Sequence, residues 1–307
     1  MMPWLQFFFG TNVDWKQVLL VGMSPIFVLA FLVEWRVMLR RGRDRQFRWK
    51  EIGANIALGG SYQIAETVMW LLITGAVFGA VYQFRLFDMP VNGWTILPIF
   101  VGVEFCYYWF HRCSHRMRWF WTAHVVHHSG ETMNFTTAMR QSVLNAFIGS
   151  YVFYLPLVLL GVPPAVVMFL YAVNLSYQYF VHTEVVGRLP RWCEFWLNTP
   201  SNHRVHHGRN PEYIDRNYGG VLIIFDRLFG TYEREDAPVD YGIPQQIVSY
   251  NFLVLNVHEF VDMVRDVLAP GPWSQRLKHL WKPPAWRRPG HEGVRTWTTE
   301  SRAADRG

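Results

Sequence analysis

Histidines with the spacing of metal ligands are the most informative feature of this chain. Eight of its twelve histidines lie in three five-residue windows, HRCSH (111–115), HVVHH (124–128) and HRVHH (203–207). Separations of three and four residues place side chains on one face of a helix, with Cβ atoms about 5–6 Å apart. Neighbouring imidazoles can then bind one ion. The windows therefore predict a polyhistidine metal centre with the ligands His111, His115, His124, His127, His128, His203, His206 and His207.

The number of histidines points to more than one ion. Imidazole binds zinc, copper, iron and nickel, so the ligand type alone does not identify the metal. Eight histidines exceed the four ligands of a tetrahedral zinc site and suit two ions with open positions. His182 is a ninth candidate ligand, and Gln178 lies one helical turn before it. Two redox-active irons beside a membrane predict O₂ activation for attack on a lipid C–H bond, because a metal without redox chemistry could not take up the electrons.

The elements that must position these histidines are apolar segments. Each histidine window follows a long apolar stretch, and most stretches are near the ~20 residues that cross the hydrocarbon core. A Gly-Val-Pro-Pro turn at 161–164 predicts a hairpin at about 141–183. We therefore expect an all-α fold, an integral membrane bundle of four to five transmembrane helices with a histidine-rich helical cap. The five segments are 17–38, 55–83, 94–110, 141–160 and 163–183.

The charge pattern predicts which side of the membrane carries the cap. The formal net charge is +6, and residues 40–50 (RRGRDRQFRWK) hold five arginines and a lysine against one aspartate. Because this run lies between two apolar segments, we interpret it as a cytoplasmic loop and expect no nucleic-acid partner. Alternating the five segments across the bilayer from that loop brings every candidate ligand to the cytoplasmic side.

Composition and the remaining segments complete the outline. Aromatic residues make up 17% of the chain, and several of the 15 tryptophans lie near the ends of apolar segments, as in an interfacial belt. The three cysteines show no disulfide framework, and the N-terminus does not resemble a cleaved signal peptide. We expect N-terminal membrane helices (1–93), a catalytic domain (94–235), and a C-terminal region (236–307) with an interfacial helix over 246–268 and a mobile tail from 283. His258, His279 and His291 are interpreted as surface residues.

Polar residues outside the windows are candidates for supporting roles. Glu104 lies in an apolar segment on the helical face of His111, where it could brace a histidine from another helix or pair with an arginine. The other candidates for bracing ligands are Gln178, Glu184 and Asp226. A polar run before the fourth segment could line the access route of a lipid headgroup or cofactor, or cap a helix. That run contains Asn134, Thr136, Arg140 and Gln141.

The spacing and surroundings of the histidines resemble a known family. HxxxH, HxxHH and a later HxxHH around a transmembrane hairpin are similar to the fatty acid hydroxylase superfamily of membrane di-iron oxygenases, which includes sterol desaturases. The resemblance covers about residues 95–235 and is greatest to the alkylglycerol monooxygenase branch. It extends beyond the histidines through four segments: HVVHHSGETMNFTTAMRQS (124–142), HTEVVGRLP (182–190), NTPSNHRVHHGRNPEYIDRNYGG (198–220) and LIIFDRLFGTY (222–232).

This resemblance implies an activity and its cofactors. The eight window histidines match the family's di-iron ligands, and His182 matches a further family histidine. Members use O₂, and the alkylglycerol branch hydroxylates the carbon beside an ether oxygen, which releases a fatty aldehyde and a glycerol. The implied external reductant is tetrahydrobiopterin, or otherwise an electron-transfer protein. Arg116 stands where that branch has a glutamate, so the sequence leaves the reductant open.

Other functions stay open at this point. A sterol or fatty-acyl hydroxylase or desaturase of the same superfamily would use the same metal centre. A membrane metal-binding or transport protein belongs to a different class, and it would place its ligands along a path near the bilayer midplane. The sequence leaves the exact lipid and the oligomeric state undetermined.

Overall fold

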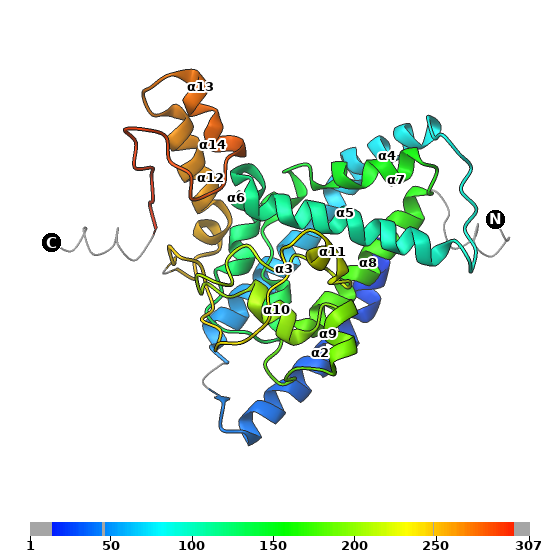
Figure 1. Ribbon diagram of the computed structural model, residues 1–307, viewed down its shortest axis with the longest axis horizontal. Helices are drawn as coiled ribbons and strands as arrows, with labels where there is room; N and C mark the ends of the chain where they lie inside the picture. Colours follow the sequence, from blue (N-terminus) through cyan, green and yellow to red (C-terminus); the bar gives the residue numbers. More distant parts are fainter. Residues whose placement is uncertain (1–13, 45–46, 248, 298–307) are drawn as a thin grey trace.

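The structure, a computed structural model, describes residues 14–44, 47–247 and 249–297. Over these ranges the chain is helical, with only two isolated bridges, Leu197–Leu222 and Gly208–Tyr241, so the predicted all-α class is confirmed. Figure 1 shows α12, α13 and α14 together at one end of the molecule. The principal helices are α2 (Trp15–Arg40), α3 (Trp49–Met69), α4 (Gly75–Gln83), α5 (Ile96–Arg116), α6 (Arg118–His128), α7 (Leu155–Leu159), α8 (Pro164–Val181), α9 (Arg191–Trp196), α10 (Pro200–His206), α11 (Ile224–Leu228), α12 (Phe252–Leu268), α13 (Trp273–Arg276) and α14 (Lys278–Trp281).

Three helices are long and apolar enough to cross a membrane. They are α2, α8 and a continuous helix over Trp49–Gln83, in which a π-helical turn, η2 (Trp70–Thr74), joins α3 to α4. Many of their apolar side chains face outward: Leu71 is 71% exposed and Val21 is 65% exposed. Apolar surface of this extent is typical of contact with lipid or a partner. The helices therefore form the membrane part of a helical protein.

The predicted hairpin is found only in part. Its turn forms at Gly161, which has φ +104°, and α8 follows as expected. The first limb is not one long helix but a series of short turns, including η4 (Val143–Ala146), η5 (Ser150–Tyr154) and α7. Gly149 interrupts it with a left-handed conformation (φ +81°), which is accessible to glycine at little cost. The prediction of a second long helix at 141–160 was therefore wrong.

The arginine-rich loop lies at the same end of the bundle as the segment that follows α8. Arg43 forms an ion pair with Glu184, and an Arg41 guanidinium N–H donates to the Val185 carbonyl over 2.9 Å. Residues 45–46 of the loop lie outside the described ranges. The loop and the histidine at the end of α8 are thus neighbours, as the alternation of segments requires.

The C-terminal helix α12 packs its polar face inward. Glu259 and Asp266 lie on that buried face, whereas Leu253 and Leu268 are 66% and 64% exposed. The inward charges are matched by Arg118 of α6, which is only 1% exposed. Arg118 donates to Glu259 over 2.7 Å and to Asp266 over 2.6 Å. The predicted surface helix is therefore attached to the histidine-bearing α6 by a buried ion cluster.

This inward face corrects the interpretation of the C-terminal histidines. His258 and His279 are 5% and 1% exposed, so the prediction that they are surface residues was wrong. His291 is only partly exposed and hydrogen-bonds to Asp266 over 2.6 Å.

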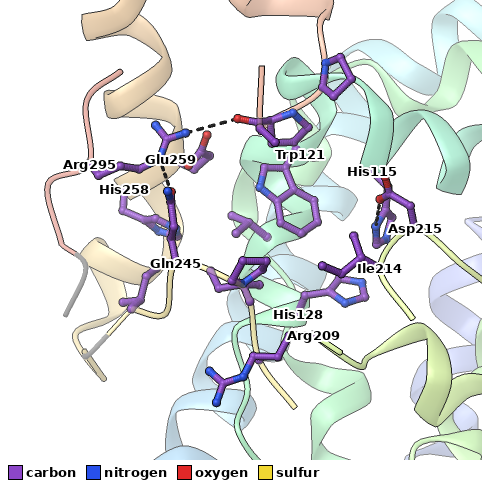
Figure 2. Close-up of a pocket in the computed structure, with 18 of the residues that line it drawn as sticks. His115, Trp121, His128, Arg209, Ile214, Asp215, Gln245, His258, Glu259 and Arg295 are labelled. Carbon is purple, nitrogen blue, oxygen red and sulfur yellow. Dashed lines mark hydrogen bonds and ion pairs between the residues drawn. The ribbon is translucent and has the colours of Figure 1, made fainter. Parts of the chain in front are cut away.

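The chain around His291 is held in the same way. The backbone N–H groups of Val294 and Thr296 donate to Asp266 and Asp262. Residues 283–297 are therefore fixed against α12, in contrast to the expected mobile tail, and residues 298–307 lie outside the described ranges. With α6, they enclose a cavity of about 310 Å³ beside His115 and His128 (Figure 2), here called the C-terminal pocket.

Replacing Arg118 should loosen this attachment. In Arg118→Met, two buried carboxylates lose their cation, which typically costs about 3–5 kcal/mol. We expect thermal unfolding in detergent at a temperature lower by roughly 10 °C. Arg265→Met is the control, because Arg265 is 51% exposed and lies 4.0 Å from its acidic neighbour. An equal effect of the two substitutions would contradict the role given to the buried cluster.

Candidate metal centre

Nine histidines converge where α5, α6, α8 and α10 meet. His111 and His115 lie on α5, and His124, His127 and His128 lie on α6; His182 ends α8; His203, His206 and His207 lie on or directly after α10. Met117, in an extended conformation, turns the chain between α5 and α6 so that their histidines face one another. The Thr199 side chain accepts the Asn202 N–H and begins α10. All nine rings are buried.

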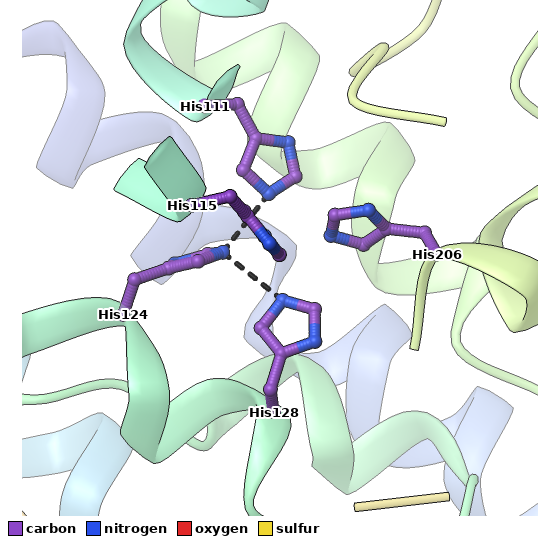
Figure 3. A group of neighbouring side chains, drawn as sticks. All are labelled: His111, His115, His124, His128 and His206. Carbon is purple, nitrogen blue, oxygen red and sulfur yellow. Dashed lines mark hydrogen bonds between the residues drawn. The ribbon is translucent and has the colours of Figure 1, made fainter. Parts of the chain in front are cut away.

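The histidines form two groups, each of which could hold a metal ion. His111, His115, His124, His128 and His206 form the five-histidine group (Figure 3). His127, His182, His203 and His207 form the four-histidine group. Within a group, the nitrogen atoms all lie within 4.8 Å of one another. Because metal–imidazole bonds are about 2.0–2.1 Å long, ligands of one ion are roughly 3–4 Å apart. Each group therefore has the dimensions of a single-ion site.

Hydrogen bonds to backbone carbonyls select one tautomer in each group. His111 Nδ1 lies 2.8 Å from the Tyr218 carbonyl, and His182 Nδ1 lies 2.6 Å from the Gln178 carbonyl. A carbonyl accepts only, so these Nδ1 atoms carry the proton and each Nε2 keeps its lone pair. The Nε2 atoms then approach one another, at 2.9 Å for His111–His124 and 2.9 Å for His182–His203.

These close approaches fit a cation. Two unprotonated nitrogens at 2.9 Å repel unless a positive charge lies between them. In the five-histidine group, His115 Nε2 and His206 Nε2 are buried and have no hydrogen-bond partner among the described residues. Burial, followed by repulsion from neighbouring rings, holds the pKa of His128 and His207 well below the usual value, and burial lowers the pKa of His182 to about 4. The rings are therefore neutral near pH 7, the form in which imidazole binds metals.

The carboxylates proposed to brace the ligands act one step further away. Glu104 contacts no histidine or arginine; it accepts the Val221 N–H over 2.7 Å, the Leu222 N–H over 3.0 Å and the Asn174 amide. Asp226 accepts the Tyr218 and Gly219 N–H groups, each over 2.7 Å. Both acids thus hold the loop whose Tyr218 carbonyl orients His111. The predicted importance of these acids agrees with their burial, whereas their expected contact with a ligand is not found.

The other two candidates for bracing ligands differ from each other. Gln178 orients His182 through its backbone carbonyl, while its side-chain oxygen accepts the Tyr107 hydroxyl over 2.8 Å. Glu184 forms its ion pair with Arg43 of the arginine-rich loop. Among these two, only Gln178 is therefore in contact with the histidines.

The polar run before residue 143 divides between structure and site. Asn134 caps the short helix η3 (Phe135–Met139), with its side chain accepting the Thr136 N–H. Arg140 is buried and donates to the Val126 carbonyl over 2.8 Å, so it holds the loop to α6. Gln141 lies 3.3 Å from His127 Nδ1. Among these residues, Thr136 and Gln141 line a cavity, described next.

A cavity of about 370 Å³ connects the membrane helices with the histidines. Its outer wall is apolar and comes from α2 and α3, including Val21, Val28 and Ile56. Its inner end is formed by His124, His127 and His182, together with Gln141 and Gln178. We call it the membrane-side pocket. Its position allows a lipid chain to reach the metal ligands directly from the bilayer.

The sequence reasoning missed Asp215, which links a ligand to Arg116. An Asp215 oxygen lies 3.6 Å from His115 Nδ1, and the other accepts Arg116 over 2.8 Å. Burial alone would raise the pKa of Asp215, but His115 and Arg116 outweigh it and lower that pKa. Asp215 has φ +62°, a conformation in which aspartate and asparagine are enriched. The only sequence signal was an acid eight residues after the third histidine window.

Comparison with known proteins identifies the family. Residues 96–231 match the family described as Fatty acid hydroxylase. Both histidine groups lie within this stretch. This part of the chain belongs to the fatty acid hydroxylase family.

Relatives within the fatty acid hydroxylase family are named for lipid oxidation. The chain is 43% identical over 205 residues to the alkylglycerol monooxygenase of Homo sapiens, an alignment that covers 66% of this chain and 45% of that protein. It is 35% identical to the alkylglycerol monooxygenase of Caenorhabditis elegans, covering 66% and 42%. The ornithine lipid hydroxylase of Rhizobium tropici is 30% identical over 160 residues, covering 52% and 48%. The chain thus spans about half the length of these relatives. No solved structure matches the chain.

Removing the charge beside His115 should weaken metal binding. A carboxylate that accepts the N–H of a ligating histidine typically contributes 10–100-fold in metal affinity, so we expect Asp215→Asn to lose roughly that factor. Competitive chelation of the iron-loaded protein measures the loss. The control is Asp240→Asn, which alters an exposed ion pair with Arg209. Unchanged affinity in Asp215→Asn would remove Asp215 from the account of the metal centre.

Proposed function

We propose that this protein is a membrane-bound di-iron monooxygenase that uses O₂ to hydroxylate a lipid C–H bond. The observation that carries the proposal is the membrane-side pocket, which leads from lipid-exposed helices to His124, His127 and His182. When bound, two irons would supply the activation of O₂ for hydrogen abstraction. The nine histidines would hold them, with His182 completing the four-histidine group.

The reaction can be written for an ether lipid. A C–H bond beside the ether oxygen, O₂, two electrons and two protons give a hydroxylated carbon and one water. The resulting hemiacetal then splits its C–O bond to a fatty aldehyde and a glycerol. The proposal of an alkylglycerol substrate rests on relatives of that name at 43% and 35% identity. A sterol or acyl chain would enter the same pocket, and the assay below separates these substrates.

The chain's own side chains would orient the lipid within the pocket. The apolar wall of α2 and α3 matches hydrocarbon, because burial of each CH₂ contributes about 0.8 kcal/mol. Polar groups are found at the inner end, where Gln141 approaches His127 and the Tyr107 hydroxyl donates to Gln178. This arrangement would place the oxygen-bearing carbons of a lipid beside the histidines and exclude bulk water from the rest of the cavity.

We also propose that the centre faces the cytoplasm. The arginine-rich loop contacts the segment directly after His182, and positively charged loops favour the cytoplasmic side. The helix α5 and residues 150–159 would complete a bundle of four to five membrane helices around a catalytic domain over 94–235. A metal transporter is disfavoured, because the histidines gather at one end of the bundle rather than along a path through it.

The central test is turnover by purified protein in detergent. Iron-loaded protein, with about two irons per chain, is incubated with O₂, a reductant and an alkylglycerol. We expect release of fatty aldehyde and its loss in His127→Ala, since His127 belongs to the four-histidine group and lines the pocket. Hydroxylation of a sterol or acyl lipid without aldehyde release would retain the oxygenase and reject the ether substrate. No oxidation of any of these lipids would reject the proposed function.

A bulky residue at Gly60 should obstruct the lipid without affecting the metal. Gly60 lines the membrane-side pocket, and a Cβ there meets nothing within 4 Å. Gly60→Phe is expected to raise KM for the lipid roughly tenfold, equivalent to about 1.4 kcal/mol, with unchanged iron content. Gly53→Phe is the matched control, because Gly53 lies on the same helix in open space and does not line the pocket. Equal KM values for both variants would place lipid binding elsewhere.

A further inference from the structure

The C-terminal pocket reaches the metal ligands by a second route. His115, His128 and His206 form one end, and all three belong to the five-histidine group. Among the described residues, this pocket shares no lining residue with the membrane-side pocket. Figure 2 shows His258 and Glu259 on the side of α12, with Trp121 in the middle of the view and His115 on the far side. A ligand bound here would approach the metal centre without crossing the lipid path.

The α12 wall presents an unused hydrogen-bond acceptor. His258 is 5% exposed, and its Nδ1 lies 3.1 Å from the Val254 carbonyl, so Nδ1 carries the proton. Its Nε2 is buried, retains a lone pair and has no partner among the described residues. Burial of an acceptor without a partner is costly, typically about 1–3 kcal/mol. A ligand N–H in the pocket would satisfy it.

Aromatic rings make the pocket suited to a flat molecule. The Trp121 ring lies 5.3 Å from the His115 ring and 5.8 Å from the His128 ring, measured between centroids. Trp121 thus connects the pocket to two candidate ligands. Trp297, from the closing segment, also lines the cavity. Stacking on such rings is favourable for planar heterocycles.

The remaining lining indicates a small polar ligand. Arg287 hydrogen-bonds to the Pro284 carbonyl over 2.7 Å and to the Trp286 carbonyl over 2.8 Å, and Asp262 also faces the cavity. A lipid chain would leave these polar groups without partners. The volume of about 310 Å³ is near the lower limit of ligand pockets, about 300 Å³, so it suits one small ring system rather than a dinucleotide.

We propose that the C-terminal pocket binds the reductant of the reaction, a small, planar, nitrogen-rich heterocycle that donates two electrons. This inference rests on the proposed monooxygenase function. His258 Nε2 accepts a ring N–H of the reductant, and Trp297 packs on its face. The reduced heterocycle loses two electrons and two protons, which, with O₂ and the lipid C–H bond, balance one hydroxylated lipid and one water. Electrons therefore arrive on the side of the five-histidine group, and the lipid arrives from the membrane.

Equilibrium binding tests the site independently of turnover. The probe is 6-methyltetrahydropterin, measured by anaerobic equilibrium dialysis against iron-loaded full-length protein in detergent. We expect His258→Ala and Trp297→Ala each to raise its Kd roughly tenfold, the scale of one lost hydrogen bond or stacking contact. His258→Gln, which restores an acceptor, should retain most of the affinity. Iron content and melting temperature identify any variant that fails to fold, and Trp297→Ala then provides the test alone.

Matched controls separate this site from general effects. Trp273→Ala removes a 61% exposed tryptophan of the same C-terminal region, and Gly60→Phe obstructs the other pocket; neither should change the Kd. Pterin affinity that is equal in the wild type and both pocket variants would overturn the inference. So would lipid oxidation that requires an electron-transfer protein and proceeds with no measurable pterin binding. Failure of the wild type to oxidise lipid with any reductant would instead overturn the proposed function.

Discussion

The mutual approach of buried imidazole lone pairs is the constraint on which the rest of this structure depends. Within each group, Nε2 atoms lie as close as 2.9 Å to one another, and backbone carbonyls fix the protons on the opposite nitrogens. Nine neutral rings in this arrangement repel, and each has lost its contact with water. A cation in each group reverses the sign of the interaction. Metal binding and the stability of the fold are therefore linked, as in other sites whose ligands converge only in the folded state.

The scaffold around the histidines works mainly through the backbone. Glu104 and Asp226 together bind the N–H groups of four residues between Tyr218 and Leu222. This fixes the loop whose carbonyl at Tyr218 orients His111. Two buried acids thus set a ring orientation without touching a ring. Asp215 is the exception, because its carboxylate faces His115 directly and is in turn held by Arg116. Arg116, unusual for the branch that the sequence resembles, has a structural partner in this chain.

The sequence was most informative where local spacing decides the outcome. The i+3 and i+4 offsets of the windows predict histidines on shared helix faces, and the structure brings all nine candidates together. The division into five and four could not be predicted, because each group draws from several windows through tertiary contacts. The first limb of the hairpin was misjudged because composition does not reveal the left-handed turn at Gly149. His258 and His279 were misjudged for a similar reason, since the direction that α12 faces depends on the distant Arg118.

Separate routes to one metal centre resolve a conflict between the reactants of a lipid oxygenase. A lipid is stable in an apolar channel from which water is excluded, whereas a reductant that diffuses in water needs polar partners. The membrane-side pocket ends on His124, His127 and His182, and the C-terminal pocket ends on His115, His128 and His206. Two adjacent ions, each open to a different pocket, would allow both reactants to be bound at once. The buried cluster of Arg118 with Glu259 and Asp266 then has a functional consequence, because it holds α12 where the second pocket requires a wall.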